Sequence, residues 1–560
     1  MARPTVSQAR RWHPESLREL ADAWDAAAGR VRSAASGPGP DGHGAMQAAA
    51  TEKWTAVVDT ATGTARAMVA AAAVARSGSE QIELARRSAV SVVDSAERTG
   101  FRVLDDGTTT ARAGGPELLQ LMTAHGDELL ARRATELTVL ITAALDALGA
   151  ADADVARKLL EELRSGSTAA ATRPAGANTS GVVAGWPTMA QDRIAAQVSA
   201  MSPQDQQGLI AAAPRQVGNT DGVPWELRVA ANRINIADAI LQERRTIDRS
   251  EQDKIRAVVD DRYGARRDRI NLERARQWIA ADPARRAAAI ADHDRMANRR
   301  IAFYQGLLAD VPDPVTGVPR PRQILAFDTD RAALIELTGD LSTATNVGVL
   351  VPGHDTTVLD SGKNTATVRR FVAAGGGDVA MITYLGGPFP TGGLWNAVNP
   401  AYATQMAPRL VAFSEDVDRT VDRIAARTGN PIAVTYLGHS YGGSILGTAE
   451  REGLTADRTV YVEAAGAGVG VHQPSDWHNR NPAVERFSMT APGDWIAPFQ
   501  GIPLGPHGAD PDEMPGVVRL DTGRRSDGTV MRGLDAHGAV LNDPSDAWHR
   551  LLEVIAGRRH

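Results

Sequence analysis

The 560-residue sequence contains no cysteine. Disulfide bonds, zinc–thiolate sites, iron–sulfur clusters and a cysteine nucleophile are therefore excluded. Aromatic residues are also scarce, at 4%, whereas hydrophobic residues make up 43% of the chain. Because alanine supplies much of that apolar content, the composition favours helices that pack through small side chains.

Neither a strong net charge nor a long apolar run is present. The chain carries 61 basic and 67 acidic side chains, a net charge of −6, which gives no general attraction to nucleic acids or anionic membranes. No run of 18 apolar residues occurs, and residues 1–10 lack the apolar core of a secretory signal peptide. We therefore expect a cytoplasmic protein without an integral membrane segment and without a nucleic-acid partner.

A chain of this length is expected to form two or three domains. Apolar residues recur every three or four positions through residues 1–165, which predicts a bundle of long antiparallel α-helices. Residues 166–185 are rich in glycine, alanine, serine and threonine, which is typical of a linker. A second helical segment, residues 186–320, is expected to lead into a catalytic domain at residues 321–560.

The sequence pattern changes at about residue 322, where short β-rich runs begin to alternate with helical stretches. Buried apolar strands that alternate with helices predict an α/β domain with a mostly parallel sheet flanked by helices. The predicted strands are residues 323–327, 346–351, 379–384, 432–437, 459–462, 484–489 and 517–520, and the clearest predicted helices are residues 404–428 and 547–556.

Ser440 lies at the centre of a Gly-x-Ser-x-Gly sequence, with Gly438 before it and Gly442 after it. An apolar, β-branched run precedes this motif and a helical pattern follows it, which is the context of a nucleophile elbow. Such a turn strains the serine backbone, and the two glycines leave room for the neighbouring strand and helix. A plain turn with serine as the helix N-cap is the alternative interpretation, and the positions of the other catalytic groups decide between the two.

The acid of a catalytic triad is expected after a strand that follows the serine, since the chain order in α/β-hydrolases is Ser, then Asp or Glu, then His. Asp494 lies in a turn after the predicted strand 484–489 and is our candidate. Glu463, which follows the earlier strand 459–462, is the rival acid.

The base is expected near the C-terminus, before the last helix. His537 has this position and is our candidate, and His507 is its main rival. His472 and His478 are weaker candidates because they precede Asp494.

An oxyanion hole needs two converging backbone N–H groups. One is expected from Tyr441, directly after the serine, and the other from the loop that follows strand 346–351. In that loop Gly353 allows a close approach of the backbone, and the N–H groups of His354 and Asp355 come next. Residues 386–400, rich in glycine and proline, are predicted to form a lid or pocket rim, with a surface loop as the alternative.

The chain resembles an actinobacterial α/β-hydrolase family long classed as a domain of unknown function. The resemblance covers residues 186–556 and rests on three motifs, which are residues 349–357, residues 438–442 and residues 217–224 with Arg228, Ala231 and Asn232 after them. It implies an α/β-hydrolase fold with a serine-hydrolase triad, and it implies no particular substrate. The family often has proline after the acid, where this chain has Trp495.

Residues 1–165 resemble the helical hairpins of small WxG-type proteins exported by actinobacterial type VII secretion systems, in length, alanine content and tryptophan placement. This chain has no Trp-x-Gly in a hairpin turn, and its first tyrosine is Tyr263, so the tyrosine-based export signal is missing. The helical region is larger than an esterase requires, and we expect it to mediate self-association or to bind a protein partner.

The sequence therefore predicts a serine esterase or lipase-like enzyme. Ser440 is the expected nucleophile, His537 the base and Asp494 the acid, acting on a small-molecule or lipid-like ester through an acyl-enzyme. This chemistry needs no cofactor and no metal ion. The alternative is a hydrolase fold that is catalytically silent and serves as a scaffold or as a secretion-associated interaction protein.

Overall fold

The computed structural model describes residues 3–35, 45–111, 126–171, 179–263, 270–494, 496, 500 and 505–559. The chain divides into two units. The helical unit comprises Met1–Arg173 and Ala237–Asp310, and the sheet unit comprises Pro174–Ile236 and Val311–His560. The units interleave along the sequence, so the predicted segment 186–320 contributes to both of them. Helix α10 (Trp225–Ile247) crosses the boundary between them.

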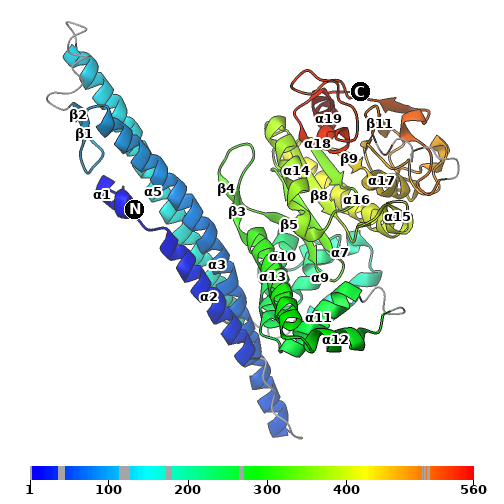
Figure 1. The fold of residues 1–560 in the computed structure, drawn as a ribbon, viewed down its shortest axis with the longest axis horizontal. Helices are drawn as coiled ribbons and strands as arrows, with labels where there is room; N and C mark the ends of the chain where they lie inside the picture. The colour runs from blue at the N-terminus through cyan, green and yellow to red at the C-terminus, as the bar shows by residue number, and fades with distance from the viewer. Residues whose placement is uncertain are drawn as a thin grey trace. The chain divides into compact units, whose positions relative to one another are not determined.

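Two very long helices dominate the helical unit (Figure 1). Helix α3 (Ala45–Arg98) packs against α2 (Glu15–Ala34) and against α5 (Gly126–Ala171). Their surfaces meet closely through small residues, since a Cβ on Gly78 of α3 would lie 2.5 Å from Val155 of α5. Helix α5 continues into the stretch predicted as a linker, where three consecutive alanines favour helix.

The remaining elements of the helical unit are shorter. None of the described helices is both long and apolar enough to cross a bilayer. These shorter elements are α1 (Val6–Arg11), β1 (Phe101–Val103), β2 (Thr109–Ala111), α11 (Glu251–Tyr263), α12 (Leu272–Ala280) and α13 (Pro283–Leu308).

The sheet unit is built on an eight-stranded sheet in the order β12-β11-β10-β9-β7-β8-β6-β5. Strand β6 runs antiparallel to both of its neighbours, β5 and β8, and all other neighbouring pairs are parallel. The prediction of a mostly parallel sheet preceded by a large helical region is confirmed, although β6 was not among the predicted strands. The strands are β5 (Gln323–Asp328), β6 (Ala333–Thr338), β7 (Asn346–Val351), β8 (Val379–Leu385), β9 (Ala433–His439), β10 (Arg458–Val462), β11 (Glu485–Met489) and β12 (Val517–Arg519).

Helices cover both faces of the sheet (Figure 1). On one face α14 (Gly362–Gly375), α18 (Ala536–Asn542) and α19 (Asp546–Ile555) join a core that includes Met381 of β8. Because side chains alternate along a strand, Tyr384 of β8 points to the opposite face. There its ring lies 5.1 Å from that of Phe413 on α16 (Ala401–Thr428), which packs beside α17 (Tyr441–Arg451).

Short helices precede the sheet within this unit, and a two-stranded hairpin leads into it. They are α6 (Thr179–Ala184), α7 (Gln191–Ser199), α8 (Pro203–Ala212) and α9 (Pro214–Asn219), with the hairpin β3 (Asp310–Pro312) and β4 (Pro319–Pro321).

The strand order reverses at β7, which lies between β8 and β9. The connections on either side of such a point leave in opposite directions, so a crevice opens at the carboxyl ends of the two strands. Residue 353 follows β7 and Ser440 follows β9. The topology therefore brings together two loops that the sequence analysis singled out.

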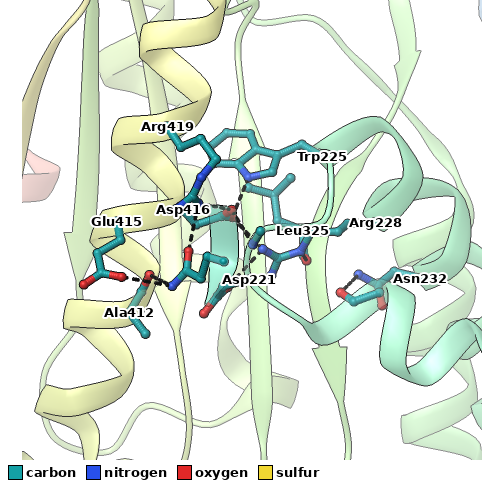
Figure 2. A network of polar contacts seen from close by, with 12 residues as sticks. Asp221, Trp225, Arg228, Asn232, Leu325, Ala412, Glu415, Asp416 and Arg419 are labelled. Atoms are coloured by element: carbon teal, nitrogen blue, oxygen red, sulfur yellow. Dashed lines mark hydrogen bonds and ion pairs between the residues drawn. The ribbon is translucent and has the colours of Figure 1, made fainter. Parts of the chain in front are cut away.

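A buried ionic network fixes the motif at residues 217–224 to the sheet (Figure 2). Arg228, 1% exposed, donates to Asp416 at 2.7 Å, to Asp221 at 3.0 Å and to the Leu325 carbonyl at 2.8 Å. Asp416 also accepts the Trp225 indole N–H at 2.8 Å. One guanidinium thus joins α10, α16 and β5, so this polar motif helps to hold the helices on the sheet.

Candidate active site

Ser440 stands on the turn between β9 and α17 with φ 55° and ψ −122°. A positive φ is unfavourable for serine, and it persists only where the surroundings enforce it. Here the Ser440 N–H donates to the Val462 carbonyl at 3.0 Å, and the Ser440 carbonyl accepts the N–H groups of Gly443 at 3.0 Å and Ala465 at 2.9 Å. These bonds to β10 and to the segment after it hold the turn in its strained form.

Glycines make this turn possible. A Cβ on Gly438 would lie 2.6 Å from the carbonyl oxygen of Gly442. One on Gly442 would overlap the carbonyl oxygen of Val351, at the end of β7. The spacing of glycines in the sequence thus matches the backbone contacts of the turn.

The loop after β7 touches the serine. A Cβ on Gly353 would lie 2.6 Å from the Ser440 Cβ, so the bare backbone of this glycine faces the candidate nucleophile. The Asp355 N–H donates to the Pro390 carbonyl at 2.9 Å, which engages one of the predicted oxyanion donors. The His354 Nε2 is buried and has no hydrogen-bond partner among the described residues.

His537 and Asp494 face one another. The His537 Nδ1 lies 3.1 Å from each carboxylate oxygen of Asp494, and the Asp494 side chain is fully buried. His537 lies in the first turn of α18 rather than in the loop before it. The turn that carries Asp494 is joined to the segment before α18 by the Gly533 N–H, which donates to the Pro492 carbonyl at 3.0 Å. Trp495 lies outside the described residues.

His439 links this pair to the elbow. Its Nε2 donates to the His537 carbonyl at 2.7 Å, and the two imidazole rings are 4.9 Å apart. Burial, followed by the neighbouring His537, lowers the pKa of His439 to about 4, so it stays neutral at physiological pH. His439 was not among the predicted site residues, although its place beside the serine was the available signal.

Glu463, the rival acid, belongs to the same cluster. It directly follows β10 with φ 45° and is fully buried. Its Oε1 accepts the Ala491 N–H at 3.0 Å. Atoms of Glu463, Asp494 and His537 all lie within 4.8 Å of one another, so the structure brings together both carboxyls that the sequence left as alternatives.

This spacing of two carboxyls and an imidazole would also suit a metal ion. Both oxygens of Asp494 already contact the His537 Nδ1, and Glu463 Oε1 accepts a backbone N–H. These bonds are the ones expected of a base held by an acid, and the nearby elbow fits the same interpretation.

His507 is engaged elsewhere. Its Nε2 donates to the Ala397 carbonyl at 3.0 Å, so its Nδ1 accepts from the Ser444 hydroxyl at 2.9 Å. Burial lowers the pKa of His507. The weaker candidates also bond to other residues. The backbone N–H of His472 donates to Asp476, and the His478 ring donates to the Arg451 carbonyl.

Residues 386–400, the rim segment, contact Asp355 and Tyr441 of the site and also His507. Asp355 accepts the Gly392 N–H at 2.8 Å and donates its own N–H to Pro390. The Tyr441 hydroxyl donates to the Asn399 carbonyl, and His507 donates to Ala397 as described above. The predicted rim therefore lies beside the catalytic loops. The side chain of Trp395, within this segment, is not among those described.

Comparison with known proteins bears on the fold of the sheet unit. The sequence model of a family described as alpha/beta hydrolase matches residues 328–502, a stretch that contains Gly353, Ser440 and Asp494. No curated protein and no solved structure gives a significant match. Together with the eight-stranded, mostly parallel sheet and its flanking helices, the match shows that the sheet unit has an α/β-hydrolase fold.

Proposed function

We propose that the protein is a serine hydrolase of the esterase or lipase type, with Ser440 as nucleophile, His537 as base and Asp494 as acid. The observation that carries this proposal is the strained Ser440 backbone, φ 55°, at the end of β9. A backbone of this kind is a cost that proteins retain mainly at functional sites. In a hydrolase fold such a backbone presents the serine hydroxyl at the carboxyl end of the sheet.

The proposed reaction begins when His537 takes the Ser440 proton while Asp494 holds the imidazole through Nδ1. Ser440 then attacks the acyl carbon, and the protonated His537 donates its proton to the leaving group. Water, activated by the same histidine, attacks the acyl-enzyme and releases the acid. The contact of both Asp494 oxygens with Nδ1 supports this role, because it fixes the tautomer in which Nε2 carries the lone pair that accepts a proton.

Backbone donors of the oxyanion hole are proposed at Tyr441 and His354. Tyr441 is the first residue of α17, so its N–H has no carbonyl partner within the helix and lies at the positive end of the helix dipole. The loop at Gly353 lies against Ser440, which supports the next N–H, that of His354, as the second donor. Asp355 is set aside here because its N–H already donates to Pro390.

The proposed substrate is a small-molecule or lipid-like ester, and the triad needs neither cofactor nor metal ion. To test the function, wild type and Ser440→Ala would be treated with a fluorophosphonate probe and assayed on p-nitrophenyl esters of graded acyl length. We expect labelling at Ser440 alone, and a loss of turnover in the variant by at least about 10⁴-fold.

Ser444→Ala is the matched control, since Ser444 lies one helical turn away and its hydroxyl bonds His507. This variant should still be labelled at Ser440. Labelling that survives Ser440→Ala would contradict the assigned nucleophile. A folded wild type that neither reacts with the probe nor hydrolyses any ester would favour the alternative, a catalytically silent scaffold.

A further inference from the structure

Glu463 lies in an unusual position behind the proposed acid. It is 0% exposed, it directly follows β10, and its φ of 45° places a non-glycine residue in the left-handed region. The Glu463 N–H donates to the Met489 carbonyl at 2.8 Å, and Oε1 accepts the Ala491 N–H at 3.0 Å. The backbone strain therefore aims this carboxyl at the turn that carries Asp494.

No cation compensates these two carboxyls. Among the described residues, neither Glu463 nor Asp494 forms an ion pair with an arginine or a lysine, and only the His537 ring pairs with Asp494. The next charged group is Asp512, which is negative as well and has its own partner, Arg519, at 3.2 Å. Two ionised carboxylates so close together in a dry site would repel strongly.

One atom of the pair lacks a partner. Glu463 Oε2 is buried and accepts no hydrogen bond from any described residue. A carboxylate oxygen in that position would be an unsatisfied charge, whereas a protonated Oε2 would be a donor. One carboxylate oxygen of Asp494 lies within 4.8 Å of a Glu463 oxygen, so Asp494 is the candidate acceptor.

We propose, as an extension of the serine-hydrolase function proposed above, that Glu463 is a positioning residue that keeps its carboxyl proton and donates it in a hydrogen bond to Asp494. The pair then carries a single negative charge, located on Asp494, where it can hold His537. The protonated Glu463 and the Ile496 N–H, which donates to Asp494 Oδ1 at 2.7 Å, together fix the orientation of the acid.

The electrostatics agree with this arrangement. Burial, followed by the charge of Asp494, raises the pKa of Glu463 to about 8. The proton is therefore present at neutral pH and is lost under mildly alkaline conditions. Its loss places a second negative charge beside Asp494, and the repulsion between the carboxylates disturbs the contact of Asp494 with His537.

Glu463→Gln tests the proposal because the amide keeps a donor for Asp494 and an acceptor for Ala491 but cannot ionise. At pH 7 we expect kcat/KM of the variant within about threefold of wild type. Above pH 8, wild-type kcat/KM should fall by about tenfold per pH unit, as for loss of one proton, while the variant stays nearly constant. Glu450→Gln is the control, since Glu450 is also fully buried but pairs with Arg486 at 2.5 Å, and it should keep the wild-type alkaline decline.

A second measurement does not depend on activity. Thermal unfolding of wild type and Glu463→Gln is followed from pH 6 to pH 9, in EDTA so that no metal ion replaces the proton. Because the folded-state pKa is raised, the stabilisation by the proton is lost as the pH rises through about 8. The Tm of wild type should fall relative to that of the variant by at least about 2 °C.

The outcomes separate the two proposals. Equal pH dependence of unfolding in both proteins would overturn the protonated Glu463, whatever the enzyme does. A difference in unfolding together with identical alkaline limbs of kcat/KM would overturn its positioning role. Failure of probe labelling at Ser440 would reject the serine-hydrolase function, while the unfolding experiment still decides whether Glu463 holds its proton.

Discussion

The sheet unit contains two pairs of buried or half-buried carboxyl groups that are stabilised in different ways. Asp221 and Asp416 share the guanidinium of Arg228, at 3.0 and 2.7 Å. Glu463 and Asp494 have no arginine or lysine among the described residues and lie beside a histidine. The first pair is held by permanent positive charges, those of Arg228 and of Arg419 at 3.6 Å from Asp416, whereas the second pair depends on a proton that can be lost as the pH rises.

The difference has a chemical reason. A guanidinium stays charged at every pH at which the protein folds, and its planar donors can bridge several elements at once. It would also draw the negative charge of a catalytic acid toward itself and away from the imidazole. A proton neutralises one carboxyl and leaves the other fully charged. The cation is thus suited to holding helices on a sheet, and the proton to leaving one charge for His537.

Breaking the proton-compensated pair should have the largest effect, and that effect should fall on catalysis. In Asp494→Asn the amide no longer stabilises the imidazolium, and it favours the wrong tautomer of His537. We expect kcat on a p-nitrophenyl ester to fall by about 10³–10⁴-fold, with unfolding by urea almost unchanged. Activity close to that of wild type would show that Asp494 is not the acid.

Breaking the cation-compensated pair should affect stability instead. Arg228→Met removes the nearer cation of Asp416, 2% exposed, and leaves Arg419 at 3.6 Å, and we expect the free energy of unfolding of the sheet unit to fall by about 3–5 kcal/mol. Arg423→Met is the matched control, because Arg423 of α16 forms an exposed ion pair with Glu226 of α10 at 3.5 Å. This pair joins the same two helices and should contribute less than about 1 kcal/mol. Equal losses in urea titrations of the two variants would refute the distinction.

Asp221 offers a smaller, pH-dependent test. Burial raises its pKa to about 6, with Arg228 opposing and Asp416 reinforcing the shift. Since the folded state binds this proton more tightly, its stabilising contribution is complete below about pH 4 and lost as the pH rises through 6. Wild type should therefore lose up to about 2 kcal/mol relative to Asp221→Asn between pH 4.5 and 7, measured by urea unfolding. A constant difference over that range would mean that Asp221 stays ionised.

Much of the fold could be predicted because it depends on local patterns. The apolar runs at residues 346–351 and 379–384 are buried on both sides, and they correspond closely to β7 and β8. The glycines around Ser440 revealed the turn because their spacing reflects backbone contacts within a few residues. The α/β-hydrolase fold is confirmed by the sheet and by the family match, whereas the assignment of the triad remains a prediction.

The features that were missed depend on contacts between distant residues. Strand β6 contains Glu336 in its centre, which pairs with Arg322 at 2.6 Å, so its pattern did not resemble that of a buried strand. The Asp355 N–H was predicted to serve the oxyanion, but Pro390 accepts it. The sequence also left Glu463 and Asp494 as alternatives, since nothing in a linear pattern shows that the ends of β10 and β11 place both carboxyls beside one histidine.

The discontinuity of the sheet unit has a consequence for how the protein is made. Arg228 is followed by its partners Leu325 and Asp416 only 97 and 188 residues later in the chain, after the inserted stretch Ala237–Asp310 that belongs to the other unit. As the chain leaves the ribosome, the Arg228 guanidinium remains solvated and without these partners while that whole stretch is synthesised. Residues 174–236 therefore cannot complete their docking on β5 and α16 during early translation. Until α16 has emerged, the segment must be kept from aggregating.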